Sequence, residues 1–235
     1  MNRICSICAR GGSKGVPNKN LAIIKNKPLI AHTIEQAKKT DLFKEISVSS
    51  DSDEILDISE KWGASFFVKR PIKLATSESA KLPAIQHNVK EVEKSKNKRF
   101  DTIVDLDATS PLREPSDIIK AVNLLEKSEK GKNLISGCVS RRSPYFNLVE
   151  LNEDGFVELS KKLENRIVRR QDSPKCFDMN ASIYIWKRDV FFKVDEILLK
   201  NTIMFEMPEE KSVDIDTKFD LNIVNFLFEQ GQYDL

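Results

Sequence analysis

The sequence has few of the residues that usually signal metal clusters or redox centres. It contains only two histidines and four cysteines among 235 residues. His32 and His87 both lie in helix-like segments with no partner in view, so we assign them no role. Cys5 and Cys8 form a C-x-x-C pair in an apolar strand-like segment, but no second pair completes a metal set. We therefore expect buried free thiols.

Long apolar runs and an excess of one charge are also missing. No stretch approaches the roughly 20 apolar residues of a membrane-spanning helix, and the signal-peptide pattern is absent. We therefore expect a cytoplasmic protein that does not bind membranes. Lysine and arginine (38) nearly balance aspartate and glutamate (36), which argues weakly against nucleic acid as a partner. The length and the 40% hydrophobic content fit one soluble domain over residues 1–235.

Strand-like and helix-like segments alternate through the first two thirds of the chain. The expected strands are 3–8, 45–50, 64–68, 100–106 and 134–139, and the expected helices are 27–38, 51–62, 80–94 and 115–126. This alternation predicts a three-layer α/β fold with a mostly parallel sheet. Residues 141–175 are polar, strand-like and irregular, which predicts an arm leaving the body. A strand at 181–186 and a helix at 218–228 follow.

A basic, glycine-containing segment follows the first strand directly. Residues 8–20 read CARGGSKGVPNKN. Glycines let backbone N–H groups approach an anion, and Arg10, Lys14 and Lys19 add positive charge. The segment is neither a Walker A loop nor a G-x-G-x-x-G fingerprint. Such loops are often ordinary turns, but the position and the three cations favour a nucleotide site at the carboxyl ends of the strands.

Two D-x-D pairs are candidate cation sites. Asp214 and Asp216 would point to the same side of an extended chain, and such carboxylates suit Mg²⁺. Alternatively, Asp216 only caps the last helix. Asp105 and Asp107 end a central strand. They could bind a metal, as D-x-D does in nucleotide-sugar glycosyltransferases, or face a ligand hydroxyl, or divide between core and cleft.

Several other polar residues are expected near the same edge of the sheet. Arg70 follows the third strand. Arg113 ends a tight polar turn and would either pair with an acid structurally or bind a carboxylate. The basic turn at Arg169–Arg170 is either a solvated loop or an anion contact. Asn180 precedes the returning strand, where its amide could contact a ligand.

Taken together and in order, these motifs resemble the acylneuraminate cytidylyltransferases, the CMP-sialic acid synthetase family. The matching segments are 9–20, 48–51, 70–71, 109–113, 170–171, 180–184 and 214–217, which span nearly the whole chain. The resemblance implies a Rossmann-like nucleotidyltransferase. It also implies a homodimer in which the arm, residues 141–178, crosses to the partner subunit.

The resemblance further implies a reaction and a set of site residues. CTP and a nine-carbon 2-keto sugar acid, a nonulosonic acid, would give a CMP-sugar and pyrophosphate by in-line attack of the anomeric hydroxyl. The implied CTP-binding and catalytic residues are Ala9, Arg10, Gly11, Gly12, Ser13, Lys14, Lys19, Asn20 and Arg70, with Asp214 and Asp216 holding Mg²⁺. The implied sugar-side residues are Thr109, Ser110, Arg170, Gln171, Asn180 and Tyr184. We see no compelling general base and expect metal-assisted deprotonation of the attacking hydroxyl.

Two departures from the family pattern concern the sugar substrate. Asp107 stands where bacterial sialic acid enzymes usually carry glutamine, and Asp178 stands where they tend to carry arginine. Acids there would suit a substituent rich in donors, which resembles the branch acting on legionaminic acid. We therefore favour N,N'-diacetyllegionaminic acid over N-acetylneuraminic acid. The alternatives are a glycosyltransferase that uses Asp105 and Asp107, and a non-catalytic nucleotide-binding protein.

Overall fold

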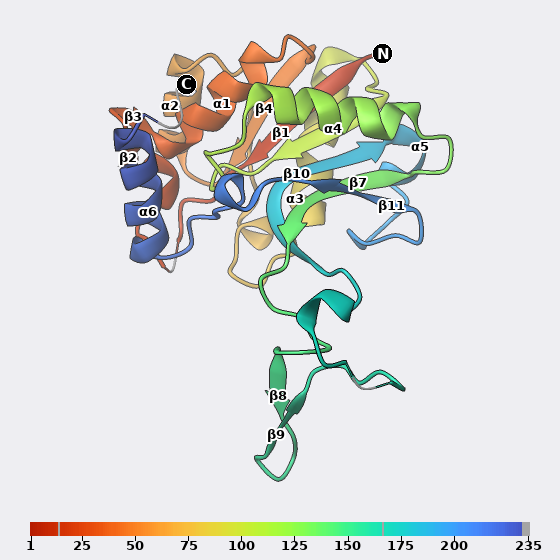
Figure 1. The fold of residues 1–235 in the computed structure, drawn as a ribbon. Helices are drawn as coiled ribbons and strands as arrows, with labels where there is room; N and C mark the ends of the chain where they lie inside the picture. The colour runs from red at the N-terminus through yellow and green to blue at the C-terminus, as the bar shows by residue number, and fades with distance from the viewer. Residues whose placement is uncertain (14, 166, 232–235) are drawn as a thin grey trace.

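A seven-stranded sheet forms the centre of the protein. The computed structural model describes residues 1–13, 15–165 and 167–231. The strand order is β11-β7-β10-β6-β1-β4-β5, and β10 alone runs antiparallel to its two neighbours among the described strands (Figure 1). The bounds are β1 Arg3–Cys8, β4 Glu45–Ser50, β5 Phe66–Lys69, β6 Thr102–Leu106, β7 Asn133–Val139, β10 Phe177–Lys187 and β11 Thr202–Glu206. The α/β class and the mostly parallel sheet are confirmed.

Helices cover both faces of this sheet, which gives the three layers. On one face, α1 (Leu29–Lys39), α2 (Asp53–Lys61) and α4 (Pro115–Lys127) pack against side chains such as Ile7 and Val104. On the other face, α3 (Lys81–Lys96) and α5 (Arg188–Phe191) pack against Ile4 and Ile103. Adjacent residues of the inner strands therefore enter different cores, which explains their nearly continuous apolar sequence.

The connection from the first strand to the first helix is longer than the sequence suggested. The short 3₁₀ helix η1 (Lys19–Leu21) and a hairpin of β2 (Ile23–Ile24) and β3 (Lys27–Pro28) come before α1. Lys25 and Asn26 make the hairpin turn with positive φ. The helix expected at 27–38 therefore begins at Leu29. The last helix, α6 (Lys218–Glu229), packs beside β2 through Ile24, Val224 and Phe228.

The segment between β7 and β10 leaves the body as an arm (Figure 1). It contains a hairpin of β8 (Val149–Leu151) and β9 (Val157–Leu159), which agrees with its strand-like sequence, although the pairing was not predicted. Large apolar side chains of the arm are exposed, among them Leu151 (72%), Phe156 (71%) and Val168 (78%). Throughout the described ranges, no helix is long and apolar enough to span a bilayer.

Candidate functional site

A cavity of about 400 Å³ opens beyond the carboxyl ends of β1 and β6. Nine of the residues singled out in the sequence line it: Arg10, Ser13, Lys19, Asn20, Arg70, Asp107, Thr109, Asp214 and Asp216. They come from four separated segments, which meet because parallel strands deliver their following loops to one edge of the sheet. The described lining residues also include Lys81, for which no sequence motif argued.

Hydrogen bonds fix the shape of the basic loop that follows β1. The Gly11 N–H donates to Asp51 Oδ1 (2.9 Å), and the Asn20 amide donates to the carbonyl of Arg10 (3.0 Å). Ala9 is buried and its N–H donates to the Ser49 carbonyl (3.0 Å), so it would meet a ligand only through its backbone. The Arg10 guanidinium donates to the Thr76 carbonyl across the cavity (3.0 Å).

The other residues expected to bind CTP differ in their surroundings. A Cβ on Gly12 would meet no atom within 4 Å, whereas a Cβ on Gly11 would lie 3.1 Å from that of Ser52. Lys14 lies outside the described residues. Arg70 is buried and donates from Nε (3.1 Å) and Nη2 (2.7 Å) to Ser49. The guanidinium is thus held in place at the cavity wall.

The loop touches the second D-x-D pair directly. A Cβ on Gly15 would run into the carbonyl oxygen of Asp216, and Lys19 Nζ lies 2.9 Å from Asp216 Oδ1. Between the two acids, Ile215 is fully buried in the core under α6. Alternation along the extended chain then turns Asp214 and Asp216 away from that core and toward the cavity.

Asp214 and Asp216 have the properties of cation ligands. Oδ1 of Asp214 is buried and has no hydrogen-bond partner among the described residues. Burial, and then the charge of Asp107, raise the pKa of Asp214. Asp216 is exposed, and Thr217, not Asp216, caps α6. Within the described ranges no three His, Cys, Asp or Glu side chains form a metal cage, so a metal here would complete its shell with water or with substrate oxygens.

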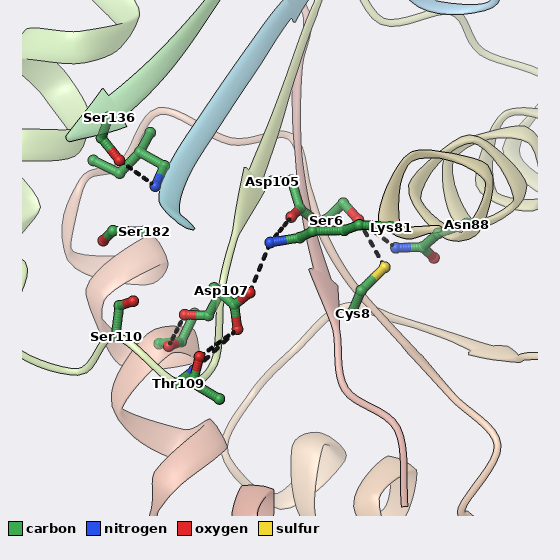
Figure 2. A network of polar contacts seen from close by, with 12 residues as sticks. Ser6, Cys8, Lys81, Asn88, Asp105, Asp107, Thr109, Ser110, Ser136 and Ser182 are labelled. Atoms are coloured by element: carbon green, nitrogen blue, oxygen red, sulfur yellow. Dashed lines mark hydrogen bonds and ion pairs between the residues drawn. The ribbon is translucent and has the colours of Figure 1, made fainter. Parts of the chain in front are cut away.

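The first D-x-D pair is divided between core and cleft, as one of the three alternatives proposed. Asp105 is fully buried, and the Asp107 side chain is 20% exposed at the cavity. Lys81, the first residue of α3, reaches between them (Figure 2). Its Nζ lies 3.1 Å from Asp105 Oδ2 and 2.7 Å from Asp107 Oδ2. Oδ1 of Asp107 accepts from Thr109 N (3.1 Å) and Oγ1 (2.9 Å).

These contacts keep Lys81 and Asp107 ionised. Burial alone would raise the pKa of Asp107, but Lys81 and the Thr109 donors outweigh it and lower the pKa to about 2. Burial would lower the pKa of Lys81, but the two acids raise it well above its usual value. The ring of Tyr184 lies 4.5 Å from the ammonium. Both oxygens of Asp107 therefore already have partners within the protein, so this carboxylate is less free to accept a hydrogen bond from a substrate than the sequence suggested.

Two residues expected on the sugar side, and Arg113, are buried beneath the surface of the site. Ser110 and Tyr184 are buried. Arg113 is also fully buried and donates to Ser182 (2.9 Å) and Thr33 (2.6 Å). It therefore holds the polar turn and does not reach a ligand carboxylate, although burial lowers its pKa to about 10.

A second hollow of about 270 Å³ adjoins the cavity and shares Asp214 with it. Asp178 and Asn180 line it, together with Arg141 at the base of the arm. Asn180 accepts from Ser136 Oγ (2.6 Å) and donates to Ser212 Oγ (2.9 Å), so its amide is already hydrogen-bonded. No residue of the basic loop is among the described lining of this hollow.

Arg170 and Gln171 lie in the arm, in the 3₁₀ helix η3 (Arg170–Asp172). Arg170 donates to the Ser140 carbonyl (2.7 Å). Neither residue is among the described lining of the cavity or of the adjoining hollow. The structure therefore brings most of the predicted CTP-side residues together but does not bring these two to the site of their own chain.

The cysteines behave as expected. All four are free thiols. Burial raises the pKa of Cys5 far above its usual value and that of Cys8 to about 11. Cys8 lines the cavity, but a thiol with so high a pKa is a poor nucleophile at neutral pH.

The chain is similar to a family model, to sequenced relatives and to solved structures. The model described as "Cytidylyltransferase" matches residues 4–231. Identity to the CMP-N,N'-diacetyllegionaminic acid synthase of Campylobacter jejuni is 46% over 224 residues, 95% of this chain and 94% of that protein. Identity to the post-translational flagellin modification protein B of Campylobacter coli is 45% over 227 residues, 97% and 95% of the two chains.

One solved structure is a CMP:2-keto-3-deoxy-manno-octonic acid synthetase complexed with CTP. It superposes with a TM-score of 0.70 at 18% identity, covering 98% of this chain and 100% of that one. At this identity the likeness concerns the fold, which is the nucleotidyltransferase architecture described above.

Proposed function

This chain belongs to the cytidylyltransferase family, and from that premise we propose that it transfers CMP from CTP to the anomeric hydroxyl of a nonulosonic acid. Pyrophosphate is the other product. The observation that carries this proposal is the meeting of the basic loop with Asp214 and Asp216 in one cavity of about 400 Å³. A triphosphate needs cations along its length and a carboxylate-held cation at its reacting phosphorus. The basic loop would supply the first, and Asp214 and Asp216 are the carboxylates that would hold the second.

The residues of the cavity would act by positioning and by charge. Arg10, Lys14 and Lys19 would bind the phosphates and stabilise the departing pyrophosphate, with Lys19 near the transferring group. The backbone of Ala9 to Ser13 would approach the phosphates, and the Asn20–Arg10 hydrogen bond keeps that backbone in place. Arg70 would contact the nucleotide from the wall. Holding both substrates in line supplies much of the rate enhancement in such a transfer.

We propose that Asp214 and Asp216 hold Mg²⁺. The fit is supported by the buried, unpartnered Oδ1 of Asp214 and by the exposed carboxylate of Asp216, since Mg²⁺ takes few protein carboxylates and completes its shell with phosphates and water. When bound, the ion would neutralise phosphate charge and lower the pKa of the attacking hydroxyl. Thr109 supports this pair, because its carbonyl accepts from Ile215 N (3.0 Å).

The sugar substrate we propose is N,N'-diacetyllegionaminic acid. The 46% identity to a protein named for that product supports it, as does Asp178 in the hollow beside Asp214. Attack on the α-phosphorus requires the anomeric carbon to lie beside the metal carboxylates, so the sugar would occupy this hollow, near Asn180 and Thr109. Ser110 and Tyr184 are buried and would position the residues that contact the sugar. N-acetylneuraminic acid is the alternative substrate.

We also propose that residues 1–235 form one catalytic domain that works as a homodimer in the cytoplasm. Its four free cysteines suit a reducing compartment. Residues 141–178 would be the dimerisation arm, because its exposed apolar side chains are typical of an interface surface. Arg170 and Gln171 would then contact the sugar acid at the partner subunit's site, since they do not line that of their own chain.

Two other functions fit the site less well. A glycosyltransferase would need Asp105 and Asp107 for its metal, and Lys81 already bridges these carboxylates. A non-catalytic CTP-binding protein would not need an Asp214 carboxylate with one buried, unpartnered oxygen, which burial makes costly to keep ionised.

Pyrophosphate release tests the proposal. The protein is incubated with CTP, Mg²⁺ and one of four acids: legionaminic (N,N'-diacetyl), pseudaminic, N-acetylneuraminic or Kdo. We expect the legionaminic compound to give the largest kcat/KM, and no release without a sugar acid. Preference for N-acetylneuraminic acid would keep the chemistry and overturn the substrate. Folded protein that binds CTP but releases no pyrophosphate with any acid would overturn the proposed function.

A further inference from the structure

The two D-x-D pairs of this chain differ in what lies between their carboxylates. Between Asp105 and Asp107 stands the ammonium of Lys81, within 3.1 Å and 2.7 Å of one oxygen of each acid. Asp216 forms an ion pair with Lys19 (2.9 Å). Oδ1 of Asp214 is buried with no hydrogen-bond partner among the described residues, and so is Oδ1 of Asp105, so the two pairs differ in the bridging lysine and not in this oxygen. One pair is thus bridged by a cation that belongs to the protein, and the other is not.

Lys81 is held in this position from three directions. Asp105 lies below it in the core with no exposed surface, and Asp107 lies beside it at the cavity. The ring of Tyr184 packs 4.5 Å from Nζ, which favours a cation further. The Asp107 carboxylate cannot easily turn away, because Thr109 donates twice to its other oxygen. The ammonium therefore sits in a prepared site and is not a surface lysine that happens to lie near an acid.

A metal ion at this position would have to displace the lysine. Divalent cations such as Mg²⁺ and Mn²⁺ prefer carboxylate oxygens, and Asp105 and Asp107 offer two. Displacement would leave the Lys81 side chain, only 24% exposed, with a charge and no counter-ion. Leaving such a buried charge unpaired is strongly unfavourable.

We propose that Lys81 occupies the cation position of the Asp105–Asp107 pair, so that this D-x-D does not bind a divalent metal and metal binding is confined to Asp214 and Asp216. Lys81 thereby supplies one fixed positive charge to the cavity beside the reacting groups, with an N–H remaining for a substrate oxygen. The inference rests on the proposed function only for the assignment of the metal to Asp214 and Asp216. The bridging of the first pair by Lys81 is independent of any reaction.

Mn²⁺ binding without nucleotide or sugar tests the inference. Free Mn²⁺ is followed by electron paramagnetic resonance during titration, at mildly alkaline pH so that the carboxylates are ionised. We expect Lys81→Ala to bind one more Mn²⁺ per chain than the wild type, and Asp107→Asn in the Lys81→Ala background to remove that extra ion. Lys81→Arg, which keeps a cation in place, should bind no more than the wild type. Circular dichroism and thermal unfolding establish that each variant is folded.

The wild-type background supplies a test that does not depend on the folding of Lys81→Ala. Asp107→Asn should leave the number of bound Mn²⁺ ions unchanged, whereas Asp214→Asn should lower it. The inference is overturned if folded Lys81→Ala binds no extra ion, or if Asp107→Asn alone removes one. Because the assay needs neither CTP nor turnover, these outcomes are separate from a failure of the pyrophosphate assay.

Discussion

At the residue scale, identical side chains acquire different chemistry from their surroundings. Asp107 is pinned by Lys81 and Thr109, and its pKa is held at about 2. Asp214 is buried beside other acids, and its pKa is raised. The first carboxylate is satisfied within the protein and the second is left for a ligand. A perturbed pKa in a cavity is typical of functional carboxylates, which supports the proposed cation role of Asp214.

Replacing Asp214 with asparagine should abolish most activity and leave the fold intact. The substitution removes the negative charge that we assign to the metal but preserves size and polarity. We expect kcat for pyrophosphate release to fall by about 100-fold or more. Asp195→Asn, at an exposed position on the body, is the matched control and should retain full activity. Near-normal kcat in folded Asp214→Asn would contradict the assignment of the metal.

The same variant should show a pH-dependent gain in stability when metal is removed by chelation. Because burial and Asp107 raise the pKa of Asp214, the folded protein holds this proton more tightly than the unfolded chain does. Ionising Asp214 therefore costs stability as the pH rises through the ordinary aspartate range, and the cost is complete above the raised pKa. We expect the Tm of Asp214→Asn to exceed that of the wild type more at neutral pH than near about pH 4. An equal Tm difference at both pH values would contradict a raised pKa for Asp214 in the folded protein.

Sequence patterns identified most of the cavity residues but not what each one contacts. Arg10, Lys19 and Asp214 belong to motifs whose chemistry is local, so their grouping was foreseeable. Lys81 is in no motif, and only the packing of α3 against β1 and β4 brings it to Asp105. Conversely, Tyr184 was expected to contact a ligand but is buried in the core that α3 covers, with the Lys81 ammonium 4.5 Å from its ring; β10 is covered on both faces, which its sequence motif does not show.

At the element scale, the close approach of two loops builds the site. The segment after β1 crosses the segment before α6 at Gly15, with no room for a side chain against the Asp216 carbonyl. Gly12, three residues earlier, has open space around it. The two glycines therefore serve different ends: Gly15 lets the protein close on itself, and Gly12 leaves space for a ligand.

Alanine substitutions at these glycines should separate the two roles. Gly15→Ala should lower the free energy of unfolding by about 1–3 kcal/mol, because the new methyl displaces one of the loops, and should lower kcat as Asp216 moves. Gly12→Ala should leave the Tm nearly unchanged while raising the KM for CTP. Thermal unfolding and steady-state kinetics on both variants check this. Equal stability losses would contradict the distinction.

Some elements were predictable from the sequence and others were not. The inner parallel strands are buried on both faces, so β1 and β6 stand out as largely apolar runs, and β4 stands out by the alternation of Ile46 and Val48 with serines. Strand β11 is short and half-buried, and residues 202–206 gave no such signal. The antiparallel direction of β10, its start at Phe177 and its bulge between Met179 and Tyr184 depend on pairing with β7, which periodicity does not reveal.

At the scale of the whole molecule, the arm is the feature that the body does not explain. It buries little of its own apolar surface, and Leu151, Phe156 and Val157 stay exposed. We propose that a second subunit covers them. Leu151→Glu should then shift the protein toward monomers in sedimentation velocity, while changing the stability of the isolated chain by less than about 0.5 kcal/mol.

Leu198→Glu is the matched control for the arm variant, because Leu198 is also exposed (56%) but lies on the body. It should leave the association state unchanged. If Leu151→Glu sediments as the wild type does, the arm is not the interface. If the wild type is itself monomeric at micromolar concentration, the proposed homodimer is wrong.

The central claim is that CTP and a nonulosonic acid are joined in this cavity. The most direct measurement is phosphorus NMR of a mixture of protein, CTP, Mg²⁺ and N,N'-diacetyllegionaminic acid. The account predicts that the triphosphate signals decline together as a CMP-sugar phosphodiester signal and a pyrophosphate signal grow in equal amounts. Inorganic phosphate without a phosphodiester, or an unchanged CTP spectrum with folded protein, would contradict it.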